Sequence, residues 1–150
     1  MTRLTPFIAA ALLAAAAAAS APASAQVVGE CEGFVANARN VDWTQPSRTY
    51  GNGDIRLVVL DTEEPAAAAF HLMVLFPDRE VGFQDCRIAS LAAQGGGYAG
   101  IDLGAAIATY DPATGLTVEL PVVVLDGDGE PAPETLTVTI NRATGEVTAR

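Results

Sequence analysis

Cys31 and Cys86 are the residues whose chemistry the sequence specifies most directly, because they are the only two cysteines. An isolated pair in an oxidising compartment usually forms a disulfide, and we predict that these two are bonded. The bond would close a loop of 56 residues, for which chain entropy gives about 4 kcal/mol of stabilisation before any native strain is subtracted. A redox pair is the alternative, but there is no Cys-x-x-Cys motif and no cation-rich turn that would activate a thiol.

His71 is the only histidine, and it stands between Phe70 and Leu72 in an apolar run. A general base needs a position facing the substrate and usually a carboxylate that orients its ring. The local sequence supplies neither, and one histidine cannot build a zinc site of the usual kind. We therefore expect a partly buried structural histidine. The alternative is a hydrolase assembled from scattered residues, either His71 with a carboxylate or an aspartate pair such as Asp85 and Asp102.

Asp126, Asp128 and Glu130 place carboxylates at alternate positions, as in the first half of a calcium loop. Such a loop needs glycine at its sixth position and glutamate at its twelfth, where this chain has Pro131 and Thr137. We expect a solvated acidic turn and no metal ion. The sequence also has no phosphate loop, dinucleotide fingerprint or nucleophile elbow, so it predicts no cofactor and gives no reason to prefer an enzyme.

Residues 1–25 have the order of a secretory signal peptide. Arg3 precedes an apolar run over residues 7–19, and the small residues Ala23 and Ala25 mark a cleavage site before Gln26. The run has 13 residues, fewer than the roughly 20 that a membrane-spanning helix needs. We therefore predict a periplasmic or secreted protein with no membrane insertion after cleavage; the alternative is an uncleaved N-terminal anchor.

Residues 26–150 form a chain of 125 residues, which is the size of a single domain. It has no lysine, and seven arginines face 18 acidic residues once Arg3 is removed, so its formal charge is −11. Such a surface repels phosphate, which excludes nucleic acid and anionic lipid as natural partners. A partner steered by charge would be cationic; the alternative is that the charge only keeps the protein soluble.

The C-terminal third of the chain contains an internal repeat. Residues 109–115 and residues 139–145 both begin with threonine, have Asp or Asn at the third position and end with Thr-Gly. Asp and Asn start turns by accepting bonds from backbone N–H groups, and glycine supplies the positive φ that ends them. Each copy therefore predicts a strand, a turn and a returning strand, and two such hairpins in tandem make a β-meander.

The remaining pattern predicts a mainly β fold, a single antiparallel β-meander sandwich or open barrel of about seven strands. Residues 27–43 have apolar residues at helical spacing and predict one short N-terminal helix, with Trp43 packed on the sheet. Residues 44–53 predict a loop. The strands are predicted at residues 55–60, 68–76, 83–91, 98–110, 116–125, 135–141 and 146–149.

The predicted strand over residues 98–110 bears on function, because its two faces differ. Odd-numbered residues, including Ile107, are apolar and are expected in the core, while Asp102 lies on the opposite face. That opposite face has small residues between Tyr98 and Tyr110, and among them Gly100 and Gly104 allow a bulge or bend part-way or a close backbone approach. If it is open to solvent it is a docking surface, and if it is covered the small residues allow close packing, which we favour.

These observations predict an exported binding or protein-interaction module, whose partner is a protein or a small molecule. The scattered-residue hydrolase is the alternative. A concave pocket that contains His71 and a carboxylate would favour the enzyme.

Overall fold

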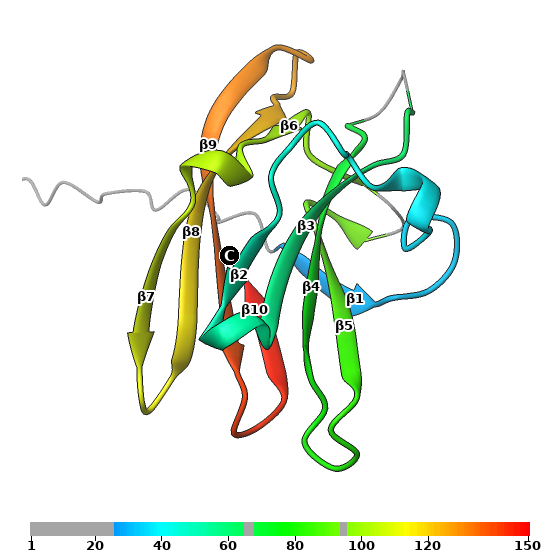
Figure 1. Cartoon of the computed structure of the whole chain (residues 1–150). Helices are drawn as coiled ribbons and strands as arrows, with labels where there is room; N and C mark the ends of the chain where they lie inside the picture. Colours follow the sequence, from blue (N-terminus) through cyan, green and yellow to red (C-terminus); the bar gives the residue numbers. More distant parts are fainter. Residues whose placement is uncertain (1–25, 65–67, 94–95) are drawn as a thin grey trace, which may run out of the picture.

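The computed structural model describes residues 26–64, 68–93 and 96–150 of the chain. These residues form a sandwich of two antiparallel sheets with five strands each, which confirms the predicted mainly β fold (Figure 1). The predicted signal peptide falls on residues 1–25, which lie outside the described residues. Within the described part of the chain, no helix is long and apolar enough to cross a membrane.

The N-terminal sheet has the strand order β1-β5-β4-β3-β2. Its central strand β4 is apolar on both faces, as expected for a strand that is covered on both sides. Leu72, Val74 and Phe76 of β4 face the second sheet and are buried. The strands are β1 (Val27–Glu30), β2 (Arg48–Tyr50), β3 (Ile55–Asp61), β4 (Phe70–Pro77) and β5 (Gln84–Ser90).

The C-terminal sheet has the order β10-β9-β8-β6, and β7 pairs with the other half of β8. The repeated turns connect β7 to β8 and β9 to β10, so the predicted meander is confirmed. In each turn the first side chain accepts a bond from the N–H two residues on: Ala113 donates to Asp111 over 2.7 Å, and Ala143 donates to Asn141 over 3.0 Å. The strands are β6 (Gly100–Ile101), β7 (Ile107–Asp111), β8 (Gly115–Leu125), β9 (Pro131–Asn141) and β10 (Glu146–Ala149).

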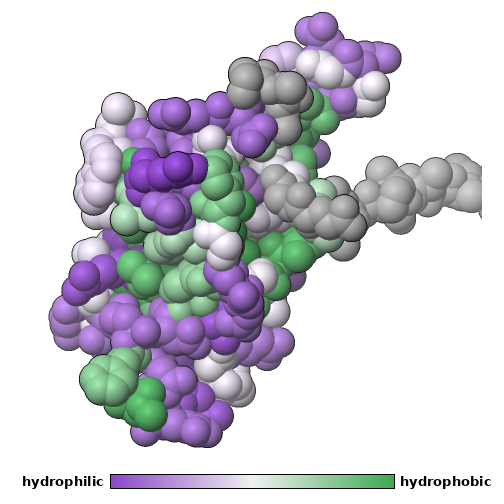
Figure 2. All heavy atoms as spheres, turned by 90° about the vertical axis from the view of Figure 1, so that its right-hand side faces the viewer, coloured by the Kyte–Doolittle hydropathy of each residue, from purple (hydrophilic) through white to green (hydrophobic). Residues whose placement is uncertain are grey.

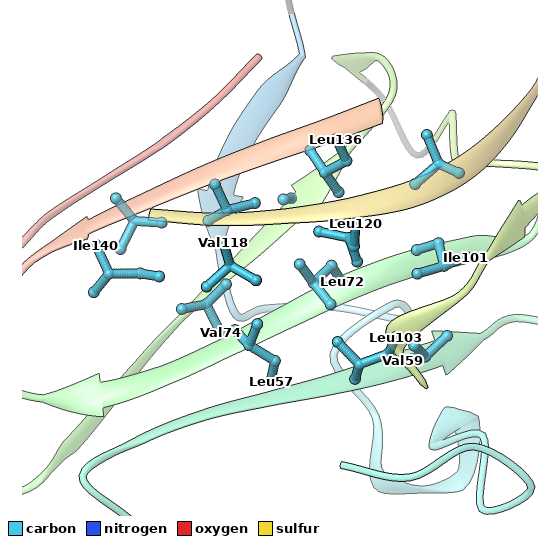
Figure 3. Packing of buried hydrophobic residues seen from close by; sticks show 14 of the residues in the cluster. Leu57, Val59, Leu72, Val74, Ile101, Leu103, Val118, Leu120, Leu136 and Ile140 are labelled. Carbon is cyan, nitrogen blue, oxygen red and sulfur yellow. The ribbon is translucent and has the colours of Figure 1, made fainter. Parts of the chain in front are cut away.

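The core lies between the two sheets, where the inward side chains of both interdigitate (Figure 3). Buried apolar positions alternate with more exposed ones along residues 116–125 of β8 and residues 136–141 of β9, as the sequence predicts. Burying a leucine or valine side chain contributes about 1.5–3 kcal/mol. The central residues are Leu57, Val59, Leu72, Val74, Val118, Leu120, Leu136 and Ile140.

The predicted N-terminal helix is wrong. The chain begins with β1, which pairs with β5, and only a short 3-10 helix, η1 (Ala38–Asn40), follows. Pairing with a distant strand outweighs local helical spacing, and Gly33 adopts a positive φ of 68° that no helix accommodates. Trp43 is 82% exposed rather than packed on the sheet, because Asp42 and Thr44 form a turn that projects it outward. The predicted loop over residues 44–53 contains β2.

The predicted strand over residues 98–110 is also wrong, because the chain leaves the sheet part-way. A 3-10 helix, η4 (Leu103–Ala105), separates β6 from β7, and Asp102 caps it by accepting a bond from Ala105 N–H. Three residues of 3-10 helix break the period of two, so the alternation changes phase. Ile107 is therefore 67% exposed and not part of the core. Tyr98 is buried in the core, so the two tyrosines do not share one face.

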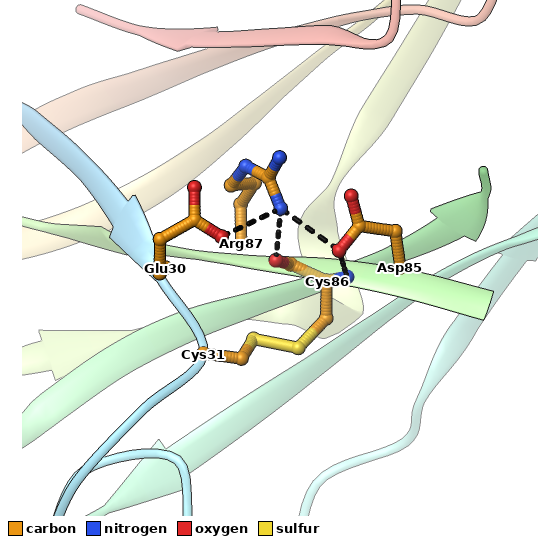
Figure 4. Close-up of polar contacts among 5 residues, drawn as sticks. All are labelled: Glu30, Cys31, Asp85, Cys86 and Arg87. Atoms are coloured by element: carbon orange, nitrogen blue, oxygen red, sulfur yellow. Dashed lines mark hydrogen bonds and ion pairs between the residues drawn. A yellow bond between two sulfur atoms is a disulfide. The ribbon is translucent and has the colours of Figure 1, made fainter. Parts of the chain in front are cut away.

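The predicted disulfide is confirmed: Cys31 and Cys86 are bonded, with 5.7 Å between their Cα atoms (Figure 4). Beside the bond, Nη1 of Arg87 lies 3.1 Å from a carboxylate oxygen of Glu30 and 2.9 Å from one of Asp85. The disulfide and the Glu30–Arg87 ion pair both join the end of β1 to β5, whereas the Asp85–Arg87 pair lies within β5. An intramolecular disulfide is typical of proteins in an oxidising, extracytoplasmic compartment.

Candidate functional site

A cleft of about 770 Å³ opens along one side of the sandwich. On the opposite side β1 and β10 contact each other, but here the edge strands β2 and β7 stand apart. Ile55, Leu116 and Ile140 form an apolar floor, and Tyr50 and Tyr110 stand on the two walls. These three residues are buried, so the base of the cleft is formed by the edge of the core, between two aromatic side chains.

The first wall is strand β7, which pairs with β8 through its inner edge. Every residue of β7 is exposed, and Tyr110 is 72% exposed. Ala108 and Tyr110 line the cleft together with Pro112 of the following turn. A strand that is exposed on both faces contributes little to the core.

The second wall is the end of β2 and the short 3-10 helix η2 (Gly51–Gly53). Tyr50 is half-buried here, and burial raises the pKa of its hydroxyl, partly offset by the nearby Arg48. Tyr50 is therefore protonated at neutral pH and can donate a hydrogen bond. An aromatic ring with a polar tip suits a surface that is apolar at its base and wet at its rim.

Two arginines span the sheets at the two ends of the cleft. Arg48 Nε donates to the carbonyl of Leu103 over 3.1 Å, and the same guanidinium donates to the carbonyl of Gly104. At the other end, Nη2 of Arg142 lies 3.0 Å from a carboxylate oxygen of Asp54. These contacts join the two sheets on the side of the sandwich where the cleft opens.

The internal repeat builds most of this site, and sequence reasoning did not foresee it. Residues 108–116 and 140–143 supply ten of the 13 lining residues. The sequence predicts both hairpins but not that their turns lie on the same opening. The alternation Arg48-Thr49-Tyr50 between Pro46 and Gly51 is the one local signal that could have indicated β2 within the predicted loop.

His71 lies elsewhere, fully buried on the outer face of β4. Its Nδ1 is 2.8 Å from Ser90 Oγ, and Nε2 is buried with no hydrogen-bond partner among the described residues. Gly97 packs against the ring, since a Cβ there would be 3.0 Å from Nε2. No carboxylate in the described part of the chain hydrogen-bonds to the ring. Burial lowers the pKa of His71, so its ring is neutral at pH 7.

The lowered pKa of His71 predicts a loss of stability in mild acid. The unfolded state binds a proton near pH 6.5 while the folded state does not, so the free energy of unfolding falls as pH decreases from about 7 to 5. The slope is at most about 1.4 kcal/mol per pH unit. Urea unfolding of the wild type and of His71→Asn should differ in this slope. Parallel curves over that range would show that His71 titrates normally in the folded protein.

The other sequence-predicted candidates do not meet in one site. Asp126 accepts bonds from the N–H groups of Asp128 and Glu130, both over 2.9 Å, so its carboxylate organises its own turn. Asp85 lies on β5 beside Arg87, whereas Asp102 caps η4 in the other half of the sandwich. Within residues 26–64, 68–93 and 96–150, no three or more His, Cys, Asp or Glu side chains form a group that could hold a metal ion.

Figure 2 shows a different face of the molecule, the one on the right of Figure 1. Apolar surface gathers in its middle and again at the bottom, over the tip of the β4–β5 hairpin. Val81 and Phe83 are the exposed apolar residues of this hairpin tip. The tip is convex, so it offers no enclosed volume comparable with the cleft. No protein family, curated protein sequence or solved structure matches this chain.

Proposed function

We propose that this protein is an exported binding module, periplasmic or secreted, that takes an apolar or aromatic group of its partner into the cleft between β2 and β7. The observation that supports this best is a concave site whose base is apolar, formed by the buried residues Ile55, Leu116 and Ile140, and whose lining also includes Tyr50 and Tyr110. Concave apolar sites with a few polar groups at the rim are the usual form of ligand pockets. The disulfide and the signal-like N-terminus support export.

An apolar or aromatic group is the occupant that this lining favours. Tyrosine rings pack against other rings and offer a hydroxyl at little cost in conformational entropy. Both arginines at the ends of the cleft are already engaged, Arg48 with the η4 carbonyls and Arg142 with Asp54. An anionic ligand would therefore have to displace existing contacts.

The alternative hydrolase receives less support from the geometry. His71 is enclosed on the far side of the N-terminal sheet, and its hydrogen-bond partner is Ser90 rather than a carboxylate. The cleft lining contains no histidine, cysteine or carboxylate. A binding role needs none of these groups, whereas acid–base catalysis most often uses a histidine or a carboxylate.

The internal repeat offers a matched pair of variants that test the proposal. Ala143 and Ala113 occupy equivalent exposed positions in the two turns, but only Ala143 lines the cleft. A titration with p-cresol, followed by amide chemical shifts, should show millimolar binding to the wild type and to Ala113→Trp. Ala143→Trp should fill the cleft and weaken binding by about tenfold or more, equivalent to about 1.4 kcal/mol.

Equal affinity of p-cresol for the two tryptophan variants would overturn the proposal. Shifts confined to residues outside the cleft would do the same, because they would place the aromatic ligand on another surface. Both variants alter exposed turn residues whose backbone bonds do not depend on the side chain, so both should remain folded.

A further inference from the structure

The free edge of β7 indicates what kind of partner carries the group that enters the cleft. We infer, on the basis of the proposed function, that the partner contributes an extended, positively charged peptide segment that pairs with β7 as an additional strand. Strand addition to an exposed sheet edge is a common mode of peptide recognition, in which backbone bonds give affinity and alternate side chains give specificity.

Strand β7 is the least protected edge of the sandwich. Of the five outer strands, β1 and β10 contact each other, β6 has only two residues, and β2 has only three residues and is tied to η4 by Arg48. Strand β7 pairs only with β8 among the described residues. Residues 107–110 contain no charge and no proline, which are the usual devices that prevent edge pairing. Ile107 and Tyr110 instead leave large apolar surfaces exposed.

The edge and the cleft are continuous. Ala108 and Tyr110 of β7 both line the cleft. In an added strand, every second side chain would point to the same side of the extended sheet. One set would therefore point toward the cleft while the other faced solvent. An apolar or aromatic residue in the first set would be the group that the proposed function requires.

The acidic side chains around β7 favour a basic peptide segment as the partner. Glu119 lies opposite Ile107 in the β7–β8 pair and is exposed. Asp102 precedes β7 and Asp111 ends it, and each accepts only backbone bonds from its own turn. None of the three forms an ion pair with another described residue. The whole chain has a formal charge of −10, so its electrostatic field attracts a cationic peptide segment and repels a second copy of this chain.

The inference is tested with three capped nine-residue peptides. The basic peptide alternates arginine and valine around a central tyrosine. The second peptide has glutamate in place of arginine. The third keeps the basic sequence but is N-methylated at alternate residues, so that one edge of the peptide strand cannot donate backbone hydrogen bonds to β7. The basic peptide should slow amide hydrogen exchange at residues 107–111 by about tenfold or more, with an affinity that falls as salt rises. The other two should bind at least about tenfold more weakly.

Charge variants of the protein supply a second readout. Glu119→Gln should weaken binding of the basic peptide about two- to fivefold, as expected for loss of one exposed charge interaction. Glu146→Gln removes an exposed acid on β10, the far edge of the same sheet, and should leave the affinity unchanged. Equal effects of the two variants would show that only the overall charge matters and would overturn recognition at β7.

The outcomes separate this inference from the proposed function. If p-cresol enters the cleft but the basic peptide fails to protect β7, or the N-methylated peptide binds as well, edge pairing is wrong and the cleft remains a binding site. If the peptide protects β7 while p-cresol fails to bind, the cleft proposal is wrong. Protection of β7 without peptide, accompanied by a dimer in sedimentation, would identify a second copy as the occupant and overturn the peptide inference.

Discussion

Gly115→Ala is expected to lower the free energy of unfolding by about 3–5 kcal/mol, through backbone strain and overpacking acting together. Gly115 ends the first repeated turn with a φ of 99°, where an alanine is strained whatever the space around it. A Cβ there would lie 2.3 Å from the carbonyl oxygen of Ile140 and 2.9 Å from Cα of Asn141. Both atoms belong to the backbone of β9, which cannot move away without breaking the β8–β9 pairing.

Gly145 ends the second repeated turn and provides the control. Its φ is 74°, but a Cβ there would meet only the side chain of Arg79, at 3.5 Å. Gly145→Ala should therefore lower the free energy of unfolding through backbone strain alone, by about 1–2 kcal/mol. Urea unfolding of both variants measures the difference. Equal losses would mean that β8 and β9 do not approach each other as closely at Gly115 as the structure shows.

Removal of the disulfide should have the other large effect. The double variant Cys31→Ala/Cys86→Ala should lose about 2–5 kcal/mol of stability, because the bond constrains a long loop in the unfolded chain. It should also loosen β1, which otherwise depends on its pairing with β5 and on the Glu30–Arg87 ion pair. Denaturant unfolding and amide exchange at residues 27–30 measure both effects.

Two results would contradict this account of the disulfide. A double variant as stable as the wild type would mean that the bond contributes nothing beyond the contacts already made by β1. Reaction of the native wild-type protein with a maleimide would show free thiols, whereas the intact mass should be two hydrogens below that of the reduced chain.

The C-terminal sheet could be predicted from the sequence because β8 and β9 each have one buried face. Val118, Leu120 and Leu136 alternate with more exposed residues, and a period of two has few other interpretations. Pro121 of β8 lacks an N–H, which favours a free side or a bulge on this strand. The pairing on that side of β8 is indeed interrupted between Glu119 and Val122, where η4 is inserted.

The rest of the fold depends on contacts between residues far apart in the sequence, which a local pattern does not contain. β1 (Val27–Glu30) forms a strand beside residues 87–90, whereas the helical spacing that predicted a helix lies after it, at residues 31–38. Residues 98–110 have an unbroken alternation, but the Asp102 cap and Gly104 allow a 3-10 turn that ends it. This is why the alternation predicts Ile107 in the core, whereas in the structure it lies on the surface.

The candidate site could not be predicted for the same reason. Its walls, β2 and β7, are more than 50 residues apart in sequence, and the cleft exists because they are edges on the same side of the sandwich. The two repeated turns are visible in the sequence, but their common position is set by the β8–β9 pairing. Only the placement of both sheets brings Tyr50 opposite Tyr110.

The most direct test of the central claim is to locate a bound aromatic ligand by intermolecular nuclear Overhauser effects. The wild-type protein saturated with p-cresol should show contacts from the ligand ring to the methyl groups of Ile55, Leu116 and Ile140, and Ala143→Trp should lose them. Contacts instead to Val81 on the β4–β5 hairpin, or to Val58 on the outer face of β3, would contradict the claim that the cleft is the binding site.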